Sequence, residues 1–252
     1  ALAEEGRLHG RLGGESQITQ LIEILCCKER SSALVLGDPG VGKSALVEEL
    51  ALRMLHGQVP PRLNGRRVLM MSVATLLSGA KFRGQFEERM LALVEEIRRQ
   101  DALLVIDHLH TLVSSGISRG GSLDAASLLK PALARGELQI IGLSGHEEFA
   151  AVLEKDPSLM RAMQVIRLPE PGAREARASV RHCAPRYEQF HGVTIQPDAI
   201  REAVAPAKLN VRERALPDSA LQIVDRAAAR TRLAGNTVVN RGAVTHTVAA
   251  IA

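Results

Sequence analysis

Between residues 33 and 56 the chain passes from an apolar run, through a glycine-rich turn, into a helical pattern. The turn, GDPGVGKS, has Gly37, Gly42, Lys43 and Ser44 at the fixed places of the pattern G-x-x-x-x-G-K-[ST]. In such a turn the backbone N–H groups curve around a phosphate, the lysine supplies a positive charge and the serine hydroxyl can ligate Mg²⁺. A chance glycine-rich turn would not be expected to satisfy all four places between a strand and a helix. The segment therefore predicts a strand–loop–helix unit whose phosphate-binding residues are Gly37, Asp38, Pro39, Gly40, Val41, Gly42, Lys43 and Ser44.

Similar apolar runs recur along the first two thirds of the chain, with helical patterns between them. The predicted strands are 33–36, 67–72, 102–107, 138–143 and 164–168, and the predicted helices are 15–28, 43–56, 85–100, 122–134 and 146–153. The runs are almost continuously apolar, which is typical of parallel strands covered on both faces. This alternation predicts an α/β fold, a doubly wound parallel sheet of five strands sandwiched by helices, with ligands at the carboxyl ends of the strands.

The pattern changes after LPEPG, residues 168–172, and becomes mainly helical. Helices are predicted over 173–190, 197–208, 217–233 and 240–252, and two short β-prone segments that could pair lie at 193–195 and 237–239. We therefore predict a large α/β nucleotide-binding subdomain over residues 1–170 and a small, mainly helical subdomain over residues 171–252. The chain has only four Phe, one Tyr and no Trp, so its cores must be aliphatic.

The charge and the cysteine content indicate which kinds of partner the protein binds and which cellular compartment it occupies. The net charge is +4 with a pI near 9.3, but the basic residues are scattered along helices, which indicates solvated helix faces rather than a nucleic-acid tract. Cys26, Cys27 and Cys183 have no metal-binding spacing, so we expect free thiols in a reducing compartment. We find no apolar run of membrane-spanning length and no signal peptide. We expect a cytoplasmic protein with no membrane or nucleic-acid partner, and, because it begins with Ala1, a piece excised from a longer chain.

A second nucleotide-binding motif ends the third predicted strand. ALLVID places Asp107 at the carboxyl end of that strand, where an aspartate can hold Mg²⁺ beside Ser44; the alternative is an Asp that merely ends a buried strand. ATPases of this type usually carry a glutamate next, which polarises the attacking water, but this chain has His108. A neutral imidazole can accept a proton, yet it lacks the charge and the two oxygens of a carboxylate. Either His108 acts as the base, or the position no longer supports fast turnover, and we favour the second explanation.

Several segments of the chain, taken together, form a pattern that is very specific for one protein family. They are RLGGESQITQLIEILC, GDPGVGKSALVEELA, VPPRLNGRRVL, SGAKFRGQFEER, LLVIDHLHTLV, DAASLLKPALARGEL, EKDPSL and RALPDSALQIVDRAAARTRL. From about residue 8 to the end the chain resembles the first nucleotide-binding module of the Clp family of ring-forming AAA+ unfoldases, above all of the ClpA and ClpC kind. It runs from VDRAAARTRL to TVVNRGAVTHTVAAI without a long insertion, which leaves no room for the coiled coil of ClpB-type disaggregases.

The resemblance implies an AAA+ P-loop NTPase fold, ATP or ADP with Mg²⁺ as cofactors, polypeptide substrates and, in the full-length parent, a hexameric ring of identical subunits. It implies that backbone at Arg11 and Leu12 meets the adenine edge, although the family's Gly-Arg pair there is replaced by two glycines. It also implies that the small subdomain closes over the nucleotide near Leu216, Pro217 and Asp218. We recognise no protease-docking loop, and a peptidase or an adaptor as partner is left open.

The segment AKFRG resembles the family's substrate-gripping pore loop, in which an aromatic side chain lies between basic neighbours. Here these residues are Lys81, Phe82 and Arg83, with glycines nearby. The alternative is that Phe82 and Phe86, four residues apart, pack together in the core as a helical pair. We expect Phe86 in the core and Phe82 in the loop, and we expect a second mobile loop over 114–122, which is rich in Gly and Ser.

Three further departures from the family pattern concern hydrolysis. Gly145 stands where the family has a polar residue that orients the hydrolytic water, which leaves Ser144 as a weak substitute. The family's tandem arginines, which reach the γ-phosphate of the neighbouring subunit, are reduced to Arg161 followed by Ala162, and the phenylalanine after them is Met163. An arginine finger contributes about 10³–10⁵ in rate, so the loss of one of two matters.

Three hypotheses follow for the function. The first, which we favour, is an ATP-binding ring module that hydrolyses slowly or not at all and whose bound nucleotide bridges its own phosphate loop and Arg161 of the next subunit. The second is an active ATPase motor that threads polypeptide through a central pore, with His108 in place of the glutamate. The third is an adaptor or scaffold with little dependence on nucleotide.

Overall fold

The computed structural model describes residues 8, 10, 13–72, 83–114, 125–210 and 214–251. The described residues form two compact units. The first is built mainly from Glu15–Gly37 and Leu46–Leu168, and the second from Asp38–Ala45 and Pro169–Ala252. The division predicted between residues 170 and 171 stays a prediction, since the phosphate loop clusters with the later part of the chain.

A five-stranded parallel sheet forms the centre of the first unit, with strand order β2-β3-β4-β1-β5. The strands are β1 (Ser32–Leu36), β2 (Val68–Ser72), β3 (Leu103–Asp107), β4 (Ile140–Ser144) and β5 (Met163–Arg167). Every one of them overlaps the strand predicted from the sequence, because each apolar run is bounded by polar or glycine-containing turns. The predicted fold class, a parallel sheet between helices, is confirmed.

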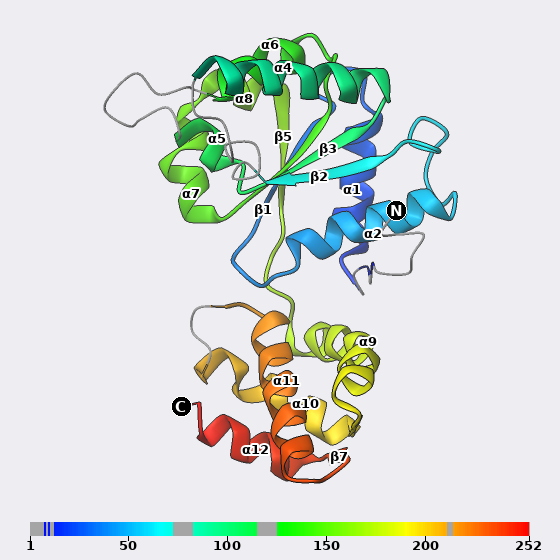
Figure 1. Ribbon diagram of the computed structural model, residues 1–252, viewed down its shortest axis with the longest axis vertical. Coiled ribbons are helices and arrows are strands. Elements are labelled where there is room, and N and C mark those ends of the chain that lie inside the picture. The colour runs from blue at the N-terminus through cyan, green and yellow to red at the C-terminus, as the bar shows by residue number, and fades with distance from the viewer. Residues whose placement is uncertain are drawn as a thin grey trace. The chain divides into compact units, whose positions relative to one another are not determined.

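Helices cover both faces of the sheet (Figure 1). On one side lie α1 (Glu15–Cys26) and α2 (Lys43–Leu55), and on the other lie α4 (Arg83–Arg99) and α6 (Ala125–Ala134). Leu34, Leu104 and Ile106 point to the second side and join a largely aliphatic cluster with helical residues such as Met90. The remaining elements of this unit are short: α5 (His110–Ser114), α7 (His146–Ala151), the 3-10 turn η1 (Leu153–Lys155) and α8 (Pro157–Ala162). The sequence pattern did not predict α5 or α8, because one or two turns are too short to display a helical period.

Central and edge strands differ in burial. All five residues of β1 and of β4 are buried, as the continuous apolar runs predict. In contrast, β2 and β5 lie at the two edges and are only partly covered, and Met70 on β2 is 55% exposed. The prediction that every strand is covered on both faces is therefore wrong for the edges, since an apolar run carries no information about its place in the strand order.

The second unit is a small helical bundle with a short two-stranded sheet. Its helices are α9 (Ala173–His191), α10 (Pro197–Asn210), α11 (Asp218–Leu233) and α12 (Arg241–Ala249). The two β-prone segments do pair: β6 (Thr194–Ile195) runs parallel to β7 (Val238–Val239). The core is aliphatic, with Tyr187 packed against it, as expected for a chain so poor in aromatic residues. A 2.6 Å hydrogen bond between His191 Nε2 and Asp225 Oδ1 joins α9 to α11.

Candidate functional site

The glycine-rich turn lies between β1 and α2, as the sequence predicts. Gly40 and Gly42 have φ of +92° and +94°, a region in which a side chain is disfavoured, so glycine is needed at both positions. Val41 is 1% exposed and anchors the turn. Lys43 begins α2 and its Nζ donates to the carbonyl oxygen of Asp38 at 3.1 Å. The lysine is thus held over the turn, where a phosphate would compete for the same ammonium group.

Within the second unit, to which Asp38–Ala45 of this turn belong, later residues contact the turn. Ala215 N–H donates to Pro39 O at 2.8 Å. A Cβ placed on Gly40 would lie 2.8 Å from Ala215 O and 2.9 Å from Asp218 Cβ, so no larger residue fits there. Asp218 accepts a 2.7 Å hydrogen bond from Arg214. The predicted residue Asp218 therefore does lie beside the phosphate loop.

Of the other residues predicted to contact the nucleotide or to form the pore loop, the structure describes only some. The Leu216 side chain is buried in the core of the small unit, and its N–H donates to Glu170 Oε1 at 3.0 Å. Pro217 precedes α11. Arg11, Leu12, Lys81 and Phe82 lie outside the described residues, as does almost all of the predicted loop at 114–122, and for Arg83 only its place at the start of α4 is described.

The end of β3 carries the two residues of the second motif. Asp107 closes the strand, and its Oδ1 accepts a 2.9 Å hydrogen bond from the His108 backbone N–H. His108 has a φ of +52°, which is uncommon for a residue with a side chain and turns the chain sharply toward α5. Its side chain is 70% exposed, and Nε2 stands 3.9 Å from Asp107 Oδ2, beyond hydrogen-bonding distance. Among the residues that the structure describes, the imidazole makes no side-chain hydrogen bond, and its ring meets that of His110 edge to face, with the centroids 5.6 Å apart.

A hydrogen-bonded link joins the carboxyl ends of β1, β3 and β4. Ser144 is 1% exposed, and its Oγ lies 3.3 Å from Nδ1 of His110 on the first turn of α5. The carbonyl oxygen of the same serine accepts a 3.2 Å hydrogen bond from the N–H of Gly37, the first residue of the phosphate loop. Ser144, predicted as a weak substitute for the water-orienting residue, is thus buried and bonded to a histidine.

His110 was not identified from the sequence as a functional residue. Burial lowers the pKa of its imidazole, and the charge of His108, whose ring centroid is 5.6 Å away, acts in the same direction; the carboxylates of Glu148 and Asp107 oppose them. The net effect favours a neutral ring, which can both donate and accept a hydrogen bond. Its place three residues after Asp107, on the first helical turn beyond the strand, is the signal that could have found it.

Glu148 is the second residue that sequence reasoning missed. A Cβ placed on Gly145 would lie 2.1 Å from Glu148 Oε2, so the carboxylate occupies the space of a side chain at position 145. Because this is the end of a flexible side chain, a larger residue at 145 would displace it easily. A carboxylate therefore lies at the carboxyl end of β4, in the space that a side chain at position 145 would need.

Arg161 lies in the last turn of α8 and is exposed. The next residues, Ala162 and Met163, end this helix and begin β5, and Met163 is fully buried. The contact of Arg161 with the nucleotide of a neighbouring subunit stays a prediction.

None of the three cysteines forms a disulfide. Within the described ranges, no helix combines the length and apolarity needed to cross a membrane.

Comparison with known proteins agrees with this geometry. Residues 33–149 match the family described as "ATPase family associated with various cellular activities (AAA)", and residues 173–249 match "AAA lid domain". The chain is 42% identical over 233 residues to the chaperone protein ClpB of Aquifex aeolicus strain VF5, a match of 92% of this chain and 23% of the relative. It is 38% identical over 240 residues to the ATP-binding subunit ClpC of the Clp protease of Staphylococcus aureus strain USA300, covering 95% of this chain and 29% of that one.

Among solved structures, a closed-state reconstruction of Hsp104 with ATPγS and FITC-casein superposes with a TM-score of 0.91 at 36% identity, over 99% of this chain and 43% of that chain. The chain spans about a quarter of the length of the curated relatives it matches. Since both ClpB and ClpC are among them, the finer likeness to the ClpA and ClpC kind stays a prediction. The chain is an AAA domain with an AAA lid and belongs to the Clp family of AAA+ modules, homologous to the ClpB and ClpC chaperones and to Hsp104.

Proposed function

We propose that this chain is an ATP-binding module of a Clp-type ring chaperone that hydrolyses ATP slowly or not at all, and that its bound nucleotide serves to hold subunits together. The observation that carries the proposal is the contrast at the carboxyl ends of the strands. The phosphate loop keeps its glycines and Lys43, whereas the position after Asp107 holds an exposed imidazole in place of a carboxylate.

The phosphate loop fits a nucleotide. Gly40 and Gly42 adopt the backbone conformation that aims N–H groups at a phosphate, and Lys43 already lies over the turn. Ser44, which is exposed, and Asp107 would hold Mg²⁺, which is usually bound through one or two carboxylates together with substrate phosphates. The metal would neutralise charge on the phosphates when bound.

The residues that would activate water are altered together. A general base must lie within hydrogen-bonding reach of the proton that it removes. Within the described residues the exposed imidazole of His108 has no side-chain hydrogen bond that would orient it, and position 145 has no side chain. Ser144 is engaged by His110 instead of being exposed. These features support weak turnover.

The relatives support the proposal of a ring and of a polypeptide substrate. A structure of the related Hsp104 contains casein, a polypeptide, together with ATPγS. We extend this to a hexameric ring of the cytoplasmic parent protein in which Arg161 meets the nucleotide of the next subunit and Lys81, Phe82 and Arg83 contact an extended polypeptide.

The second candidate is an active motor in which His108 acts as the base. It is favoured by one observation: the site still offers titratable groups, namely His108, His110 and the Glu148 carboxylate beside Gly145. In this case the imidazole accepts the proton of the attacking water.

Binding and hydrolysis of ATP measured on the same sample decide between the two. We expect micromolar binding of ATP with Mg²⁺, negligible phosphate release, and loss of binding in Lys43→Ala. His108→Glu should raise phosphate release. Rapid turnover by the unaltered chain that is abolished in His108→Ala would refute the proposal and establish the motor, and absence of ATP binding would refute both.

A further inference from the structure

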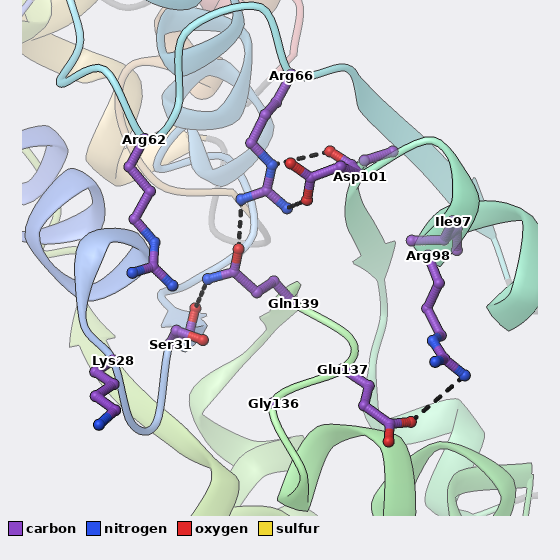
Figure 2. Close-up of a pocket in the computed structure, with 11 residues that line it drawn as sticks. Lys28, Ser31, Arg62, Arg66, Ile97, Arg98, Asp101, Gly136, Glu137 and Gln139 are labelled. Atoms are coloured by element: carbon purple, nitrogen blue, oxygen red, sulfur yellow. Dashed lines mark hydrogen bonds and ion pairs between the residues drawn. The ribbon is translucent and has the colours of Figure 1, made fainter.

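The first unit has a hollow at the edge of the sheet where the strands begin, opposite the edge that carries Asp107 and Ser144. Its volume is about 350 Å³. Figure 2 shows its walls, which come from the turn before β2, the ends of α1 and α4, and the segments that precede β1, β3 and β4. The lining residues are Lys28, Ser31, Arg62, Arg66, Ile97, Arg98, Asp101, Ala102, Gly136, Glu137 and Gln139.

Arg66 is fixed at the back of the hollow, with only 10% of its side chain exposed. Its Nε donates to Asp101 O at 2.9 Å, and its Nη2 lies 2.9 Å from Asp101 Oδ1. Its Nη1 donates to Gln139 Oε1, and the amide nitrogen of Gln139 donates to the carbonyl oxygens of Leu25 and Ser31 at 3.0 and 3.1 Å. The guanidinium is therefore held in one orientation by buried Gln139 on one side and by exposed Asp101 on the other.

The charges around Arg66 are not balanced. Four cationic side chains line the hollow against two carboxylates, which leaves an excess of two positive charges. Asp101 pairs with Arg66, and Glu137 lies 3.6 Å from Arg98. Within the part of the chain that the structure describes, neither Lys28 nor Arg62 has a hydrogen bond or an ion pair. Burial is the main cause that lowers the pKa of Arg66; the carboxylate of Asp101 opposes it, and the charge of Arg62 lowers the pKa further.

Helix ends explain only part of this cluster. The carboxyl ends of α1 and α4 carry a partial negative charge that attracts Lys28 and Arg98. Arg62 and Arg66 come instead from the turn Pro60–Arg66, which buried Leu63 anchors and in which Leu63 N–H donates to Pro60 O at 2.9 Å. A rigid turn thus holds two guanidinium groups near each other with a single carboxylate partner. An anion between them would relieve their repulsion.

We propose that this hollow binds a small phosphate-bearing anion, whose oxygens meet Arg62 and Lys28 in front of the fixed guanidinium of Arg66. Guanidinium and ammonium groups are the usual partners of phosphate in proteins. A phosphate group carries about 1.5 to 2 negative charges near neutral pH and so matches the excess of two, whereas a single carboxylate carries one. The volume suits a small ligand. This site is independent of the nucleotide bound at the phosphate loop.

The test uses Lys43→Ala, in which the phosphate loop is disabled, and titrates it with pyrophosphate and, separately, with ATP by calorimetry. We expect one saturable pyrophosphate site that weakens as salt is raised. Adding Arg62→Ala or Lys28→Ala should weaken it about tenfold, the effect of one hydrogen bond to a charged group. ATP binding that depends on Arg62 would identify a nucleotide as the source of the phosphate, and pyrophosphate binding alone would identify free phosphates.

Arg67→Ala is the matched control, because Arg67 is an exposed neighbour of Arg66 that does not line the hollow and donates to Gln100 at 3.2 Å. It should leave pyrophosphate binding unchanged. Equal weakening by Arg62→Ala and Arg67→Ala would mean diffuse attraction to a basic surface, and this result, like the absence of saturable binding, would overturn the proposal.

Discussion

Gly142, in the middle of β4, leaves space for the side chain of Leu109, the residue between His108 and His110. A Cβ placed on Gly142 would lie 2.5 Å from Leu109 Cδ2 and 3.3 Å from both Leu109 Cβ and Cγ. Leu109 is 1% exposed, and its N–H donates to Leu143 O at 2.9 Å, so it has little freedom to move. We therefore expect Gly142→Ala to strain the turn that carries His108 and His110.

The magnitude follows from the overlap. Gly142 is not in the left-handed region, so alanine adds no backbone strain. Overpacking of a buried site costs about 1–3 kcal/mol, while replacing a strand glycine by alanine returns about 0.5–1 kcal/mol. We expect a net loss of about 1–2 kcal/mol in the free energy of unfolding. Leu109→Ala alone leaves a cavity and should cost about 2–5 kcal/mol.

The double variant gives the decisive measurement. With Leu109 truncated, the new methyl group at position 142 enters space that the leucine has left, so the two effects should fall short of their sum by about 1 kcal/mol or more. Urea unfolding followed by far-UV circular dichroism suits a chain without Trp. Strict additivity, or a Gly142→Ala chain as stable as the unaltered one, would show that the predicted contact does not constrain the site.

Other predictions concern the buried polar contacts. His110→Ala leaves the buried hydroxyl of Ser144 without its imidazole partner and should lower the free energy of unfolding by about 1–3 kcal/mol, whereas His110→Asn, which keeps a polar group near Nδ1, should cost less; thermal unfolding of both variants measures this, and equal losses would contradict it. The folded-state pKa of His110 is depressed below 6.5, so its contribution to stability is present above that pH and is lost as the pH falls through the lowered pKa. The unaltered chain without nucleotide should therefore lose stability on acidification more steeply than His110→Asn. Parallel profiles of stability against pH would argue against this assignment. Asp156 caps α8 by accepting a 3.1 Å hydrogen bond from Leu159 N–H, and it pairs with Lys130 at 2.7 Å. Asp156→Ala should therefore lower the free energy of unfolding, measured in urea, by about 1–2 kcal/mol, and Asp156→Asn, which retains the cap, should lower it less. The reverse order would contradict the role of the cap.

Much of the fold could be predicted because its signals are local. The phosphate loop needs glycines at set spacings, and Gly40 and Gly42 do adopt left-handed backbone. Each strand is an apolar run bounded by turns, so all five were found. The substitutions at His108 and Gly145 could be recognised for the same reason, since each lies within a short motif whose neighbours are unmistakable.

The sequence by itself determined that the chain forms a parallel sheet around a phosphate loop, followed by a helical unit. Only the tertiary structure decided which strands are central, that His110 holds Ser144, that Glu148 occupies the space above Gly145, and that Arg62 and Lys28 line one hollow. The physical reason is the range of the interactions. Backbone conformation and burial period are set by residues a few positions apart, whereas the His110–Ser144 contact and the lining of the hollow join segments that only the order of the strands brings together. Glu148 is only three residues from Gly145, but its side-chain conformation is not fixed by that spacing.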